Sequence, residues 1–215
     1  MSRFRELLDH PEVEEVCVLR GHELVREHRI GFMAYHGGGL EEVTEVVAQA
    51  AAERAGASYY GVHQPIGMER HIPSIEVSPS ASERLHSFIE HVHSVITIHG
   101  FGRMGFFASL LVGGRHRDLA EHVGGHLRRH LPAYDVITDI DAIPSDLRGL
   151  HPRNPVNLPP GAGVQIELPP RVRGTSPMWW DWEGPDLNPH TASLVNALAE
   201  AAATWFSGAP SSPIR

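Results

Sequence analysis

A chain of 215 residues with 41% hydrophobic and 20% charged residues has the composition of an ordinary globular protein. Its formal net charge of −8 excludes a general nucleic-acid binder, which carries a basic balance. No apolar run approaches the roughly 18 residues that a membrane helix needs, and the N-terminus lacks the apolar segment of a secretory signal. We therefore expect a cytoplasmic protein, which cell lysis can release, with neither a nucleic-acid nor a membrane partner. The sequence does not indicate an oligomeric state.

Short apolar runs alternate with helical stretches along the chain. Strands are expected at 16–19, 30–35, 58–62, 95–98, 106–112, 135–138 and 164–168, and helices at 41–54, 82–93, 117–131 and 191–206. A Pro-, Gly- and Asn-rich stretch at 152–163 predicts a loop before the last strand. This order predicts an α/β fold, with a mixed, mostly parallel sheet covered by helices on both faces. We expect a single catalytic domain over 1–206 and a flexible tail over 207–215.

The first candidate site is a glycine loop at the end of the second expected strand. His36 is followed by Gly37, Gly38 and Gly39, and Glu41 stands at the start of the next expected helix. Glycines let the backbone pass close to a bound group, and a helix N-terminus favours a carboxylate. Because imidazole nitrogen and carboxylate oxygen both bind zinc, the loop predicts a metal site. A glycine turn with a capping glutamate is the alternative.

Two further candidates lie on an expected strand or directly after one. His99 follows the strand 95–98, and ligands of open α/β sheets gather beyond the carboxyl ends of the strands. Glu167 lies in the apolar strand 164–168, where an ionised carboxylate is costly unless it is paired. Either it faces outward from an edge strand or it serves as a general base toward a metal-activated water. For His99 the alternative is a hydrogen-bonded core histidine.

Three more histidines repeat every four residues on one expected helix. His122, His126 and His130 have a spacing that suits a metal pair, but no His-Glu-x-x-His pattern accompanies them. We therefore expect them to be surface or interface residues.

Four segments in a fixed order resemble the poly-γ-glutamate hydrolase family of phages and bacteria. They are Y-H-G-G-G-L-E at 35–41, T-I-H-G at 97–100, L-V-G-G-R at 111–115 and G-V-Q-I-E-L at 163–168, and the resemblance covers about residues 14–175. The family consists of zinc amidohydrolases related in fold to the zinc carboxypeptidases, so the resemblance implies a carboxypeptidase-like domain that holds zinc. It implies that His36, Glu41 and His99 are the zinc ligands and that Glu167 is the general base or acid.

The resemblance and the charge distribution both point to an acidic, peptide-like substrate. Residues 150–157 resemble the family's His-Pro-x-Asn block, and residues 100–175 carry nine arginines and seven acids, a balance of +2 that leaves −10 for the rest. Guanidinium groups pair bidentately with carboxylates. The candidate substrate contacts are Arg103, Arg115, Arg153, Asn154 and Asn157.

The chain departs from the family pattern at two places. The family usually carries proline and glycine after the first glutamate, where this chain has Glu42 and Val43, and it often carries arginine where this chain has Leu158. Glu42 is therefore an alternative ligand, although the spacing favours Glu41.

The implied reaction is hydrolysis of γ-glutamyl amide bonds, as in poly-γ-glutamate. One alternative is a zinc amidase that acts on cell-wall peptide or on small N-acyl amino acids. Another is a catalytically silent module that binds a metal or an acidic ligand. The same ligand set also binds other divalent ions.

Overall fold

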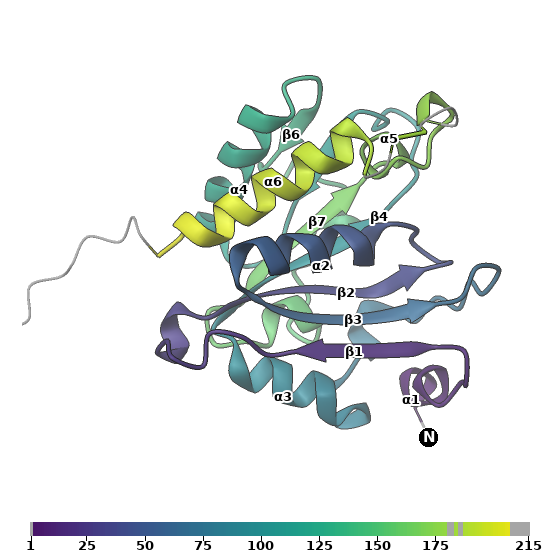
Figure 1. Ribbon diagram of the computed structural model, residues 1–215, viewed down its shortest axis with the longest axis vertical. Helices are drawn as coiled ribbons and strands as arrows, with labels where there is room; N and C mark the ends of the chain where they lie inside the picture. The colour runs from purple at the N-terminus through teal and green to yellow at the C-terminus, as the bar shows by residue number, and fades with distance from the viewer. Residues whose placement is uncertain (1, 180–182, 185–186, 207–215) are drawn as a thin grey trace, which may run out of the picture.

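The computed structural model describes residues 2–179, 183–184 and 187–206, so the tail expected at 207–215 lies outside the described residues. These residues form a single α/β domain around one seven-stranded sheet (Figure 1). The strands are β1 (Glu14–Val18), β2 (Ile30–Gly38), β3 (Ser58–Gln64), β4 (Ser94–Gly100), β5 (Ser109–Val112), β6 (Asp135–Ile137) and β7 (Gly163–Leu168). The helices are α1 (Arg3–Leu8), α2 (Thr44–Ala55), α3 (Glu83–His91), α4 (Arg117–His130), α5 (Pro170–Arg173) and α6 (Pro189–Thr204). None of these helices is long and apolar enough to cross a bilayer.

The sheet has the strand order β1-β3-β2-β4-β7-β5-β6. The pairs β3–β2, β2–β4, β4–β7 and β5–β6 are parallel, whereas β1 runs antiparallel to β3 and β5 antiparallel to β7. The prediction of a mixed, mostly parallel sheet is therefore confirmed. Its consequence is that β2, β4 and β7 lie side by side with their carboxyl ends at the same edge.

Helices cover both faces of the sheet, as predicted (Figure 1). On one face α2, α4 and α6 bury a core that includes Phe32, Ile98 and Ile166. On the other face α1 and α3 pack over a second core that includes Met33 and Tyr35. Because successive side chains of a strand point to opposite faces, the polar residues of β7 point away from the first core. One of them, Gln165, contacts the loop that precedes β7 through Asn154.

Two expected elements begin three residues later than predicted. The helix expected at 41–54 begins at Thr44, because Val43 has a left-handed backbone with φ of 74° that ends any helical continuation on its N-terminal side. Glu41 therefore lies in the turn before α2, and the prediction that the helix N-terminus holds its carboxylate is wrong. The strand expected at 106–112 begins at Ser109, whose backbone N–H closes a turn on the carbonyl of Phe106.

The histidine series on α4 faces α6. His122 Nε2 lies 3.0 Å from the carbonyl of Ala201, and His130 Nε2 lies 2.8 Å from Glu200 Oε2. His126 is buried between the two helices. The three are therefore residues of the interface between α4 and α6.

Candidate metal centre

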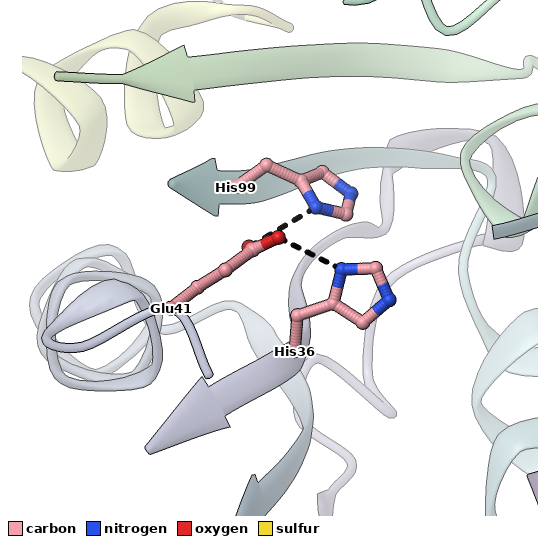
Figure 2. Close-up of side chains that lie close together, drawn as sticks. All are labelled: His36, Glu41 and His99. Carbon is pink, nitrogen blue, oxygen red and sulfur yellow. Dashed lines mark hydrogen bonds and ion pairs between the residues drawn. The ribbon is translucent and has the colours of Figure 1, made fainter. Parts of the chain in front are cut away.

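The candidate ligands meet at the carboxyl edge of the parallel strands. His36 lies near the end of β2, His99 near the end of β4, and Glu41 in the loop that follows β2. Figure 2 shows the carboxylate of Glu41 between the two imidazole rings. One ligand atom from each of the three residues lies within 4.8 Å of those of the other two. The group can therefore hold a metal ion.

Hydrogen-bond distances define how Glu41 is held. Its Oε1 lies 2.9 Å from His36 Nδ1, and its Oε2 lies 3.2 Å from His99 Nδ1. The backbone N–H of Gly100 also donates to Oε2, at 2.9 Å. Glu42, the alternative ligand, has an exposed side chain. Glu41 rather than Glu42 is thus the carboxylate that faces both histidines.

The glycines of the loop allow this approach. Gly38 has φ of 73°, and a Cβ there would lie 2.0 Å from the carbonyl oxygen of Gln64. A Cβ on Gly39 would lie 2.4 Å from the carbonyl oxygen of Pro65. The loop therefore folds tightly against the end of β3, which returns the backbone N–H of Glu41 to the carbonyl of His36 at 3.0 Å.

The outer nitrogens of both rings are engaged by the protein. His36 Nε2 lies 2.8 Å from the carbonyl oxygen of Ile72, and His99 Nε2 lies 2.9 Å from the hydroxyl of Tyr35. A carbonyl only accepts, so Nε2 of His36 carries a proton, and Nδ1 is the ring nitrogen that faces Glu41. At Nδ1 either a second proton or a metal ion can therefore lie between the ring and the carboxylate. This donor set, with its outer nitrogens anchored, fits a divalent metal.

The pKa shifts describe the same arrangement. Burial lowers the pKa of His36, but the charge of Glu41 and its hydrogen bond outweigh burial, and the net pKa is raised. Burial raises the pKa of Glu41, but the two imidazoles pull it far below its usual range. The site therefore favours a carboxylate together with positive charge on or between the rings.

Glu167 lies on the neighbouring strand and points to the same face. It pairs with His99 across β4 and β7, and its side chain is only 4% exposed. Because β7 lies between β4 and β5, the interpretation of Glu167 as an outward residue of an edge strand is wrong. Gln165 Nε2 donates to its Oε1 at 2.8 Å. Burial, reinforced by Glu41 and opposed by His99, raises the pKa of Glu167 to about 7.

A polar cleft of about 660 Å³ opens beside these residues. Its walls come from the segment after β3 and from the segment that precedes β7. It is lined by His71, Pro73, Ser74, Ile75, Ser145, Asp146, Arg148, Gly149, Leu150, His151, Asn154 and Gln165. The imidazole of His71 lies 5.1 Å from that of His36, ring centre to ring centre. Sequence patterns did not single out His71 or Arg148, because both lie in irregular segments that only the fold brings to the cleft.

The five predicted substrate contacts do not gather in one place. Arg103 is exposed and paired with Asp146 at 2.6 Å. Arg153 is exposed and lines a different depression, beside Arg3 and Glu76. The exposed Arg115 uses its backbone N–H to reach Asn157.

The two asparagines are bonded within the protein. Asn157 donates to the carbonyls of Gly149 and His151, at 2.7 and 3.0 Å, which closes the loop before β7. Asn154 lines the cleft but is itself buried, with its amide bonded to Tyr35 and Gln165.

A buried arginine connects β7 to the loop between β2 and α2, which carries Glu41. Arg173 donates through Nη1 to the carbonyl of Glu42 at 2.7 Å and through Nε to the carbonyl of Leu168 at 3.2 Å. Burial lowers the pKa of Arg173, while the nearby glutamates, with Glu41 first, oppose that shift. Arg173 lies six residues after Glu167 in the sequence, but its bond to the carbonyl of Glu42 is a tertiary contact.

Comparisons with known proteins place the chain in a family. The model of the poly-gamma-glutamate hydrolase family matches residues 2–178. No curated protein sequence matches the chain. A bacteriophage poly-gamma-glutamate hydrolase has a similar structure, with 18% identity, a TM-score of 0.74 and coverage of 91% of this chain and 90% of that chain. A zinc-free structure of YNDL has 20% identity, a TM-score of 0.69 and coverage of 90% of each chain.

A more distant fold neighbour completes the picture. A protein from Burkholderia mallei, provisionally named a carboxypeptidase, has 13% identity and a TM-score of 0.54, over 91% of this chain and 64% of that chain. The zinc-carboxypeptidase-like fold predicted from the sequence is confirmed. The chain belongs to the poly-gamma-glutamate hydrolase family and is a hydrolase that acts on amide bonds.

Proposed function

We propose that the chain is a zinc-dependent amidohydrolase that cleaves γ-glutamyl amide bonds in a poly-γ-glutamate-type substrate. The observation that carries the proposal is the His36, Glu41 and His99 group, with Glu167 on the adjacent strand at the same sheet edge. Two imidazole nitrogens and one carboxylate oxygen form a three-ligand set that leaves a fourth position open. Zinc held there would polarise the amide carbonyl and lower the pKa of a water molecule.

Glu167 supplies the proton chemistry in this proposal. Gln165 occupies Oε1, and within the described part of the chain Oε2 accepts no hydrogen bond from the protein. A pKa of about 7 suits a group that takes a proton from water and passes it to the leaving amine near neutral pH. Its burial also keeps the carboxylate away from bulk water, which strengthens each electrostatic interaction that it makes.

The substrate part of the proposal is supported by the family match and by the cleft. The bacteriophage neighbour is itself named a poly-gamma-glutamate hydrolase. The cleft beside the ligands carries Arg148, whose Nε donates to the carbonyl of Ile143 at 2.8 Å and whose Nη1 lies 3.6 Å from the exposed carboxylate of Asp141. Such a fixed cation can pair with a substrate carboxylate.

One experiment tests both the reaction and the substrate. Zinc-loaded protein is incubated with poly-γ-glutamate, and the products are sized by chromatography beside those of Glu167→Gln. We expect shorter glutamate oligomers from the wild type and a loss of about 100-fold or more in rate for the variant, which keeps its metal. An intact polymer would refute the substrate, and muropeptide release from cell wall in a parallel assay would identify the alternative amidase. Equal rates for the two proteins would refute the role of Glu167.

A further inference from the structure

A continuous chain of buried side-chain hydrogen bonds joins the two halves of the site. It runs from His99 Nε2 to Tyr35 Oη at 2.9 Å, and from Tyr35 Oη to Asn154 Oδ1 at 3.2 Å. It continues from Asn154 Nδ2 to Gln165 Oε1 at 2.8 Å, and from Gln165 Nε2 to Glu167 Oε1 at 2.8 Å. None of the five residues is more than 4% exposed. Water therefore does not compete for these bonds, and each lost partner leaves a buried polar group unsatisfied.

The direction of the bonds at the His99 end is determined by a backbone group. The N–H of Val156 donates to Asn154 Oδ1 at 3.2 Å, which assigns this atom as the oxygen. Tyr35 then has to donate its single hydroxyl proton to the same oxygen, so that its own oxygen is left to accept. The proton that it accepts is that on Nε2 of His99. In the neutral ring this hydrogen bond leaves Nδ1 of His99 unprotonated, on the side where Glu41 lies.

The other end is determined in the same way. The carbonyl of Leu147 lies 3.4 Å from Gln165 Nε2, and a carbonyl only accepts, so this atom is the amide nitrogen. Gln165 Oε1 therefore faces the Asn154 amide nitrogen, and Gln165 Nε2 donates to Glu167 Oε1. This hydrogen bond fixes the rotation of the Glu167 carboxylate and leaves its other oxygen, Oε2, without a hydrogen bond from the described residues.

We propose that Asn154 is a positioning residue for both groups. Through Tyr35 it determines which ring nitrogen His99 presents toward Glu41. Through Gln165 it determines the orientation of the Glu167 carboxylate. The inference rests on the proposed function, because it assigns His99 to a metal and Glu167 to proton transfer. It also gives Asn154 a role other than the substrate contact expected from the sequence. Both polar atoms of its side chain form hydrogen bonds within the protein.

The test separates the two ends by their readouts. Tyr35→Phe removes the acceptor of His99, and we expect the Kd for zinc, measured by chelator competition, to rise by about 10- to 100-fold. Gln165→Met removes the donor to Glu167 without adding charge. We expect it to keep the zinc Kd within about threefold and to lower kcat by about 10-fold or more with little change in KM.

A double-mutant cycle tests whether Asn154 acts through Tyr35. If it does, Asn154→Ala raises the zinc Kd, and adding Tyr35→Phe raises it no further than the larger single effect. Asn157→Ala is the control, because it loosens the same loop without touching the chain of bonds, and its zinc Kd should match the wild type. All variants are compared by circular dichroism and thermal unfolding.

Several results would overturn the proposal. Fully additive effects of the two substitutions on the zinc Kd would show that Asn154 and Tyr35 act independently. A wild-type zinc Kd in Tyr35→Phe would refute the positioning of His99, and a wild-type kcat in Gln165→Met would refute the positioning of Glu167. A lower melting temperature with no change in zinc Kd or kcat would indicate a purely structural role. If the wild-type protein cleaves no amide substrate, the proposed function fails, and the zinc cycle by itself then decides whether the chain of bonds positions His99.

Discussion

His99 of β4 and Glu167 of β7 are direct partners in a parallel strand pair. The register places the candidate ligand and the candidate base on one face, with Ile98 and Ile166 on the opposite face in the helix-covered core. A slip of one residue would turn Glu167 into that apolar core, where its carboxylate would have no partner. The geometry of the candidate site is therefore held by the same packing that stabilises the sheet.

Removing either imidazole should abolish metal binding. The three donors converge within 4.8 Å, so the loss of one leaves two ligands and an open, weak site. We expect about one equivalent of zinc in the wild type and little in His36→Ala or His99→Ala, measured by elemental analysis after dialysis. His122→Ala is a suitable control, because His122 packs against Ala201 on the far helix pair. Full occupancy in both site variants would refute the metal centre.

The rate of hydrolysis should fall on the acid side of neutrality. Glu167 acts as a base only when it is ionised, and burial raises its pKa to about 7 in the metal-free protein. A bound cation lowers this pKa, so we expect the acid limb of kcat/KM to have its midpoint at or below about pH 7, with a slope of about tenfold per pH unit. A pH–rate profile measures it. A rate that stays constant down to pH 4 would contradict this assignment.

Glu167 should also destabilise the metal-free fold at neutral pH. Its folded pKa lies above the unfolded value, so the stability contributed by the neutral form is complete at low pH and is lost as the pH rises from about 4.5 to about 7. We expect metal-free Glu167→Gln to be more stable than the wild type at pH 8, by on the order of 2 kcal/mol, and equally stable at pH 4. Denaturant unfolding at the two pH values measures the difference, and a constant offset would argue against the raised pKa.

Val43 is a strained residue close to Glu41, in the loop between β2 and α2. A β-branched side chain at φ of 74° is sterically disfavoured, and this is a position where the resemblance leads one to expect glycine. We expect Val43→Gly to be more stable than Val43→Ala by about 1 kcal/mol, the reverse of the usual order in a helix. Both variants lose the same packing, so the comparison isolates the backbone. Thermal unfolding that ranks alanine above glycine would show that the left-handed conformation carries no cost.

The sequence alone was enough to predict the architecture, and it singled out four side chains that the fold brings to one edge of the sheet. Alternating strands and helices require a largely parallel sheet, and its carboxyl ends must bring His36 and His99 to one edge. An acid within the apolar strand of Glu167 needs a partner, which is a signal that does not depend on knowing the fold. The start of α2 could not be predicted, because composition favours helix throughout 41–54 and only the left-handed turn at Val43 prevents it.

What only the tertiary structure decided is how these groups are oriented. Asn154 has an ordinary loop context, and its bonds to Tyr35 and Gln165 join segments that are 119 and 11 residues away in the chain. Arg173 reaches the carbonyl of Glu42 across 131 residues. Local patterns report which residues are apolar, acidic or turn-forming. Hydrogen-bond partners depend on distances between side chains, and these distances are set only after the sheet has formed and the loop before β7 has packed over it.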